Sequence, residues 1–279
     1  MRERALVLPG SVLLLSAACD GLIRPPDPLE TDPDVVTVAI MLIAGESSAR
    51  MLAVHPHRAL TDSPPVVDAV LQGSGWTAAL SETLPVESCT AATAEKWPGP
   101  ASCFHAALPE AIRPGTTYGI EGTALLGAFT GSVVVPGTPV LLEPDDTVTL
   151  PPPSQGRRVE VVVRYVIDPE VGTVRAEIPS AFEISDDGAE VRVDTGPFDL
   201  IPSTLNGAGT DTLSLRYRDR PMRVSLRLLG IGWNYTNFVK YTSSFPLPQP
   251  WPGFGIAGEG VYGYFAAATP SRAVEIRVR

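Results

Sequence analysis

The stretch "RRVEVVVRYVIDPEVG", residues 157–172, has the alternation that decides the fold. Val159, Val161, Val163 and Tyr165 alternate with polar or charged residues such as Glu160 and Arg164. A period of two puts alternate side chains on opposite faces of a strand, so this segment is predicted to have one buried and one solvent-exposed face. Further strand-like runs follow: "TVRAEI", "AEVRVD", "TLSLRY", "MRVSLRLLGI" and "AVEIRVR". Together they predict an antiparallel β-sandwich over residues 157–279.

The first half of the chain is also built of short β-rich runs. "VVTVAIMLIAG", residues 35–45, is too apolar for an exposed edge and is predicted to be a central strand. Six more runs follow: "RMLAV", "VVDAVLQG", "WTAALS", "CFHAALP", "TTYGIEG" and "GSVVVP". This density of short strands is typical of an immunoglobulin-like sandwich, which we expect over residues 35–140. In "IRPGTTYGIEG" the tyrosine, Tyr118, is predicted to pack under the preceding turn.

Prolines and acidic residues cluster between the two halves, and we expect a linker over residues 141–156. The predicted fold class is all-β, with two immunoglobulin-like β-sandwich domains and at most one short helix. That helix is predicted in "NYTNFVKYTSS", residues 234–244, where Asn234 is a suitable N-cap.

The N-terminal 18 residues are typical of an export signal. Arg2 and Arg4 precede an apolar run, and small residues lead into Cys19. The run is too short and too interrupted for a membrane span. "LSAAC", residues 15–19, resembles the lipobox of bacterial lipoproteins, which implies cleavage before Cys19 and acylation of that cysteine, including palmitate. An ordinary secretory signal that happens to end near a cysteine is the alternative.

Residues 19–34 are predicted to be the acylated cysteine and a proline-rich tether. Polyproline conformation extends by about 3.1 Å per residue, so the tether could hold the folded part up to about 45 Å from a membrane. The expected location is the cell envelope, lipid-anchored. Asp20 resembles an inner-membrane retention signal of some Gram-negative bacteria, but the outer membrane is favoured over the inner.

The formal net charge of −10 excludes some partners. An acidic chain does not bind nucleic acid or anionic lipid head groups by charge, so membrane attachment is expected to rest on the acyl chains of Cys19. "GFGIAG", residues 253–258, matches a dinucleotide fingerprint, but prolines precede it instead of a strand and glycines follow instead of a helix. We therefore predict no nucleotide and no cofactor.

Cys89 and Cys103 are the other two cysteines. In an oxidising compartment a pair this close is most simply a disulfide. A zinc site is the alternative, but a structural zinc site needs four ligands. Besides the two thiols, the segment between them contains only Glu95 as a possible ligand, and His105 lies just outside it.

The sequence contains few candidates for catalytic or metal-binding residues. "HPH" could place His55 and His57 on one side of an extended strand, yet no acid follows in a metal-hydrolase spacing, so we expect a surface turn around Pro56 and no metal site. The sequence contains neither a G-x-S-x-G elbow nor a Ser-x-x-Lys motif. We expect no catalytic residues and no enzyme activity.

Aromatic side chains are the remaining candidates for a contact site. They are Trp97, Trp233, Trp251, Phe254, Tyr262 and Tyr264. Such residues anchor protein interfaces, but beside prolines and glycines they pack as often into a domain's own core, and both interpretations stay open. The expected function is non-catalytic binding or scaffolding, to an outer-membrane receptor or other envelope protein. The alternative is a carbohydrate-binding surface lipoprotein, in which exposed aromatic rings stack on sugars.

The chain as a whole resembles a family of uncharacterised bacterial lipoproteins, a domain of unknown function often encoded beside TonB-dependent outer-membrane receptors. The resemblance rests on the lipobox and tether, "PGTTYGIEG…GSVVVPG", "NYTNFVKYT" and "EGVYGYFAA". The last motif departs from the family form at Glu259 and has one apparent extra residue, and the cysteine loop looks like an addition. The resemblance implies two sandwich domains on a lipid anchor and no catalytic residues.

Overall fold

The computed structural model describes residues 34–56, 58–59, 61–90, 99–153, 158–185, 187–193, 198–200, 207–217, 220–244 and 254–279. The predicted signal, Cys19 and nearly all of the tether lie outside the described residues, as do His57, Trp97 and Trp251. The described part consists of strands β1 to β18 and two helices, which confirms the all-β class. The predicted helix is present as α2 (Trp233–Ser244), and a single-turn helix, α1 (Glu87–Thr90), was not predicted.

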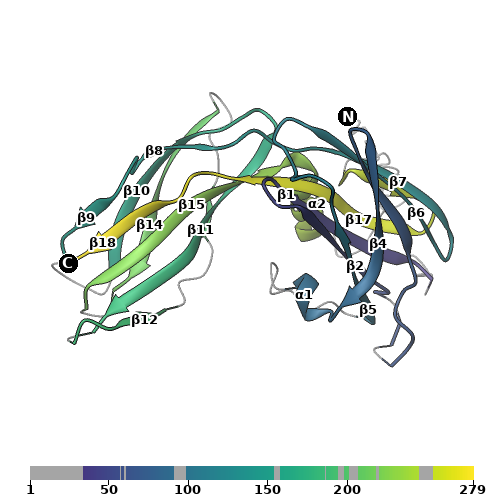
Figure 1. Ribbon diagram of the computed structural model, residues 1–279, viewed down its shortest axis with the longest axis horizontal. Coiled ribbons are helices and arrows are strands. Elements are labelled where there is room, and N and C mark those ends of the chain that lie inside the picture. The colour runs from purple at the N-terminus through teal and green to yellow at the C-terminus, as the bar shows by residue number, and fades with distance from the viewer. Residues whose placement is uncertain are drawn as a thin grey trace, which may run out of the picture. The chain divides into compact units, whose positions relative to one another are not determined.

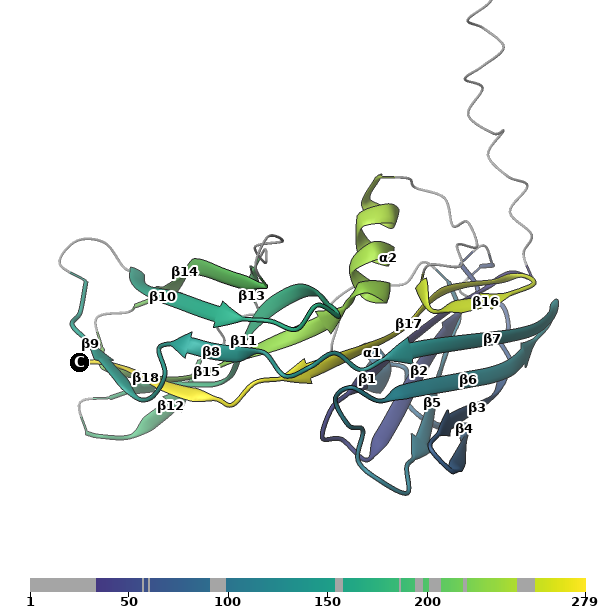
Figure 2. The ribbon, with the colours of Figure 1, turned by 90° about the horizontal axis from the view of Figure 1, so that it is seen from above.

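The first half is a sheet that folds back on itself around one core (Figures 1 and 2). Its strand order is β17-β1-β2-β5-β4-β3-β6-β7-β16. The bounds are β1 (Val36–Ile43), β2 (Ser48–Val54), β3 (Asp68–Gly73), β4 (Trp76–Leu84), β5 (Ala101–Ala107), β6 (Thr117–Ala124), β7 (Gly127–Val134), β16 (Ile256–Gly258) and β17 (Val261–Pro270). The fold-back occurs at β4, which pairs with β3 along its first residues and with β5 along its last. The two layers enclose a core that includes Ile40, Leu71 and Phe129.

The second half is a sandwich of two sheets. One contains β8 (Val140–Glu143), β10 (Arg158–Val166) and β14 (Ala208–Arg216). The other is built on β11 (Val171–Ile184), β15 (Met222–Gly232) and β18 (Val274–Val278), with β9 (Val148–Leu150), β12 (Glu190–Arg192) and β13 (Phe198–Leu200) at its margins. The predicted alternation is confirmed, because Val159, Val161, Val163 and Tyr165 of β10 are buried and the residues between them along the strand are exposed.

The C-terminal part of the chain does not keep to the predicted boundaries. β16 pairs with β7 and β17 pairs with β1, so Ile256 and Phe265 belong to the first core, although residues 157–279 were predicted as the second domain. The physical reason is that β1 is apolar on both faces and lies between β2 and β17, which shield it on either side. The predicted linker also contains structure, since β9 and most of β8 lie within residues 141–156.

Continuous strands connect the two halves. The residues of β15 from Met222 to Leu226 pair with β18 in the second half, and those from Leu229 to Ile231 pair with β17 of the first. β11 follows β15 over almost its whole length. Both halves accordingly belong to one compact unit, Pro33–Arg279. A hinge between them would have to break backbone hydrogen bonds.

One glycine permits the close pairing of β1 and β17. Gly263 lies opposite Val38 in the parallel register and has a positive φ of 106°. A Cβ atom at this position would lie 1.9 Å from the carbonyl oxygen of Val38. Only glycine satisfies both the backbone conformation and the contact distance.

The tyrosine predicted to pack under a turn does so. Tyr118 is 1% exposed, and the backbone N–H of Arg113 donates a hydrogen bond of 3.1 Å to its phenolic oxygen. This bond holds the loop that leads into β6 against the core, in the manner of a tyrosine corner.

The variant Tyr118→Phe should lower the free energy of unfolding by about 1 kcal/mol, because the part-buried backbone N–H of Arg113 loses its acceptor. Tyr217→Phe is the matched control, since Tyr217 is also buried but no hydrogen bond of its hydroxyl is described. Urea unfolding followed by tryptophan fluorescence measures both variants. Equal midpoints for the two would contradict a stabilising role for the corner.

Candidate functional site

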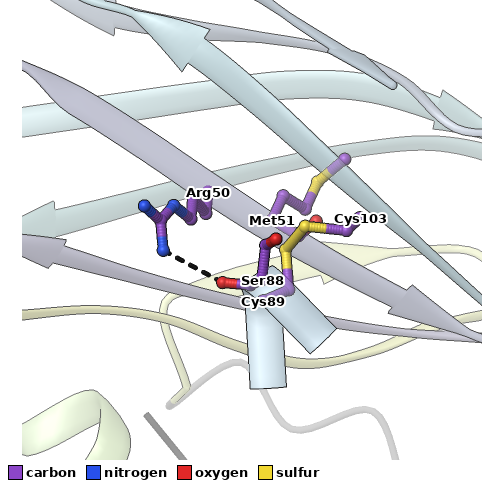
Figure 3. Close-up of a disulfide and its surroundings, with 5 residues drawn as sticks. All are labelled: Arg50, Met51, Ser88, Cys89 and Cys103. Carbon is purple, nitrogen blue, oxygen red and sulfur yellow. Dashed lines mark hydrogen bonds between the residues drawn. A yellow bond between two sulfur atoms is a disulfide. The ribbon is translucent and has the colours of Figure 1, made fainter. Parts of the chain in front are cut away.

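The disulfide predicted between Cys89 and Cys103 is present, with an S–S distance of 1.97 Å. It ties α1 to β5 (Figure 3). The guanidinium of Arg50, on β2, donates a hydrogen bond of 3.0 Å to the carbonyl oxygen of Ser88 and so fixes α1 from a second side. The disulfide therefore holds the segment that follows β4 against β5. Because the two sulfur atoms are bonded to each other, they are not zinc ligands.

Two of the candidate contact aromatics are core residues, so of the two interpretations left open for them the packing in the domain's own core holds. Phe254 and Tyr264 are each 6% exposed. Their rings pack against α2, with Phe238 at 5.6 Å from Phe254 and at 4.9 Å from Tyr264 between ring centroids. The reason is that Phe238 and Tyr241 of α2 pack against these rings, and α2 lies next to β17. Tyr262 is half-buried.

Among the described residues, Trp233 at the start of α2 is the only exposed aromatic side chain, with an exposed fraction of 39%. Its indole N–H donates a hydrogen bond of 2.9 Å to the carbonyl oxygen of Pro169, and the ammonium of Lys240 lies 5.5 Å from its ring centroid. One face of the ring is therefore already covered by a cation.

The histidines do not form a metal site within the described residues. His55 is 3% exposed, and its Nδ1 donates a hydrogen bond of 3.1 Å to the carbonyl oxygen of Val35. It is thus a buried structural histidine, and its backbone begins the predicted turn around Pro56, because the N–H of Arg58 donates a hydrogen bond of 3.4 Å to the carbonyl oxygen of His55. His105 is half-buried on β5. No group of three or more potential metal ligands occurs among the residues described.

Among the described residues, two side chains have a perturbed pKa, and the local surroundings explain each shift. Burial in the second core, with a smaller contribution from the carboxylate of Asp211, raises the pKa of Tyr165. Hydrogen bonds from the hydroxyl of Ser185 and from the backbone N–H of Ala189 lower the pKa of the exposed Asp187, in the turn that precedes β12. A packed core and a tight turn account for both shifts.

The first half carries an open, mostly apolar hollow of about 1030 Å³. β3, β4, β6 and β7 supply nearly all of its lining, and Phe104 of β5 contributes one ring. A row of residues crosses these strands in register: Ala79, Val70, Glu121 and Thr130. Val70 is 36% exposed on this face, and Val66, just before β3, is 80% exposed at the margin of the hollow. Small neighbours such as Ala79 and Ala128 leave the apolar floor open to solvent.

Two carboxylates border this apolar floor. Glu121 lies directly opposite Val70, and Asp68 lies opposite Thr123. Asp68 and Glu121 are therefore diagonal neighbours on one face, a relation that places Cβ atoms about 7–8 Å apart. Both are exposed, and no ion pair or hydrogen bond of either side chain is described in this part of the chain. The hollow thus combines exposed aliphatic surface with unneutralised negative charge.

Sequence reasoning missed the hollow because each of its strands by itself is ordinary. The one local signal is in "VVDAVLQG", where Val66 and Val70 occupy the alternate positions that would normally be polar on a solvent-facing side. The neighbours of Val70 on β4 and β6 follow only from the pairing register, which a single sequence does not reveal.

Comparison with known proteins gives little beyond architecture. No protein-family model and no curated protein matches this chain. Among solved structures, it is similar to the N-terminal Ig1-2 module of the Drosophila receptor protein tyrosine phosphatase DLAR, at 11% identity over 88% of this chain and 99% of that one, with a TM-score of 0.29. It is also similar to titin domains Z1Z2 in complex with telethonin (12% identity, 88% and 94% covered, TM-score 0.21) and to CBD12 from CALX1.2 (10% identity, 87% and 100% covered, TM-score 0.21). At these values the similarity assigns no function.

Removing the disulfide should lower the free energy of unfolding by about 3 kcal/mol, because the bond spans a sequence separation of 14 residues and constrains the unfolded chain. Urea unfolding with and without a reducing agent measures the effect in the wild type. The double variant Cys89→Ala, Cys103→Ala is the control, and its midpoint should not respond to the reducing agent. A wild-type midpoint that is equally unresponsive would show that the bond contributes nothing to stability.

Proposed function

We propose that this chain is a lipid-anchored protein of the bacterial cell envelope that binds another envelope protein, an outer-membrane protein in particular, without catalysing a reaction. The anchor is proposed to be acyl chains on Cys19, and the polypeptide itself stays outside the bilayer. Three features support the proposal: the signal and lipobox of residues 1–19, the acidic charge and the disulfide. Disulfides form and persist in exported proteins, which agrees with passage out of the cytoplasm. Among the described residues no helix is long and apolar enough to cross a bilayer.

The hollow over β3, β4, β6 and β7 carries the binding part of the proposal. Val66 and Val70 lose unfavourable water contact when an apolar side chain covers them. Asp68 and Glu121 repel each other across the same surface, and a lysine or arginine of a partner would relieve that repulsion. The hollow therefore suits a protein segment that presents an aliphatic side chain next to basic ones.

A sugar ligand fits the described surface less well. Carbohydrate recognition of the kind considered above uses exposed, coplanar aromatic rings, and in the described part only Trp233 offers an exposed ring, with Lys240 already over it. An aliphatic hollow bordered by carboxylates is instead typical of a protein-binding site.

The lipid anchor has a direct chemical test. Mass spectrometry of the N-terminal peptide of the membrane-extracted protein should find a mature chain that begins at Cys19 and carries acyl groups. The variant Cys19→Ala should move from the membrane fraction to the soluble fraction, because the polypeptide has no other proposed attachment. An unmodified Cys19, or an N-terminus at another residue, would support the ordinary secretory signal instead.

The hollow is tested by affinity capture from gently solubilised native membranes. The wild type should recover one outer-membrane protein in near-equal amount. Val70→Arg should lose at least nine-tenths of it, because the arginine places a large cation on the apolar floor and neutralises the neighbouring carboxylates. Val191→Arg is the matched control, since Val191 is also an exposed strand residue, at 50% exposure on β12. Undiminished recovery by Val70→Arg would exclude the hollow as the binding site.

A further inference from the structure

A second exposed apolar surface lies on the outer face of the three-stranded sheet in the second half. Four aliphatic side chains are exposed there, and their exposed fractions range from 39% to 52%: Val140, Leu142, Val162 and Val166. Val140 of β8 lies directly opposite Val166 of β10, and Val162 is on the same face of β10. The intervening residues of β10 point inward to the second core, so these four side chains have no packing role there.

An arginine pair occupies the other end of the same face. Arg158, the first residue of β10, lies directly opposite Arg216, the last residue of β14. Both are exposed, and no hydrogen bond or ion pair of either guanidinium is described. Glu160 is on the same face of β10, opposite Ser214, but forms no described ion pair with them. Like charges directly opposite each other destabilise a strand pair, so this arrangement is unfavourable unless an anionic group binds.

The charge of this face differs from that of the whole molecule. It carries Arg158, Arg164 and Arg216 against Glu143 and Glu160, whereas the chain as a whole has a net charge of −10. Arg164 and Glu143 neutralise each other through an ion pair of 3.5 Å. The charge left on the face is therefore that of Arg158 and Arg216, partly offset by Glu160, at the end away from the aliphatic patch.

We infer that the outer face of β8, β10 and β14 is a docking surface for an acidic, aliphatic segment of a partner protein. The carboxylates of that segment bind Arg158 and Arg216, and its aliphatic side chains cover Val162, Val166, Val140 and Leu142. From Arg158 to Val166 the face is about 27 Å long at roughly 3.4 Å per residue, which an extended segment of about nine residues spans. This surface goes beyond the proposed function. Its charge is opposite to that of the hollow, so it binds an acidic segment, whereas the hollow binds a basic one.

Two peptides of nine residues test the inference. In one, glutamate alternates with valine, and in the other lysine replaces glutamate. Each is titrated at low salt into the full chain, purified in a neutral detergent, and binding is followed by fluorescence anisotropy of a dye on the peptide. The acidic peptide should bind at least tenfold more tightly than the basic one. The double variant Arg158→Glu, Arg216→Glu should reverse that preference.

The control is Arg113→Glu, an exposed arginine of the first half whose described ion pair is with Glu110. It should leave the preference unchanged, as should Val70→Arg, which blocks the hollow. Binding that depends on Arg158 and Arg216 but not on Val70 or Cys19 separates this inference from the proposed function. Equal affinity for both peptides, or a preference that survives the double charge reversal, would overturn it.

A second copy of the chain is the competing occupant. Light scattering on the wild type and on Val162→Glu distinguishes it: a monomer in both agrees with the inference. A wild-type dimer that dissociates in Val162→Glu would assign the face to self-association and overturn the inference.

Discussion

The parallel pairing of β1 with β17 is the interaction on which the rest of the structure depends. It brings residues from opposite ends of the described chain into one sheet and gives the apolar β1 its second neighbour. Without β17, the first core would lose Phe265 and Ala267, and α2 would lose the surface that it covers. β15 would also lose the strand that joins it to the first half. The close approach at Gly263 is thus a requirement of the whole arrangement rather than of one turn.

The same pairing connects the two halves firmly, and this connection bears on the role of the two exposed surfaces. The acidic hollow lies on the first half and the arginine-bearing face on the second. β11 pairs with β15 on both sides of the junction between the halves, with a register irregularity between Glu177 and Ser180. Surfaces of opposite charge that are held on one framework would not collapse onto each other. Such an arrangement is suited to a scaffold that holds two different partners at a constant spacing, which agrees with the binding role proposed for the chain.

Local physical chemistry in the sequence predicted the features whose causes are local. The alternation in residues 157–172 predicted a half-buried strand because a strand repeats every two residues, and the burial of β10 confirms it. The positions of Tyr118, of the helix near Asn234 and of the disulfide were predicted for similar reasons. The location of β17 was not, because no local signal states which distant strand a segment pairs with. Phe254 and Tyr264 also could not be assigned from sequence, since their burial depends on α2 lying over them.

The return of the C-terminal strands to the first half has a consequence for biosynthesis. A chain that is exported from its N-terminus exposes residues 34–134 first, yet the first core stays open until β16 and β17 have also emerged. The second core is likewise incomplete until β18, which ends at Val278, has paired with β15. In such a chain, neither half can therefore finish folding while part of the other is still being translocated. If the chain is exported as proposed, nearly all of it has to reach the far side of the membrane before either core closes, and during that interval its apolar strands depend on protection from other molecules.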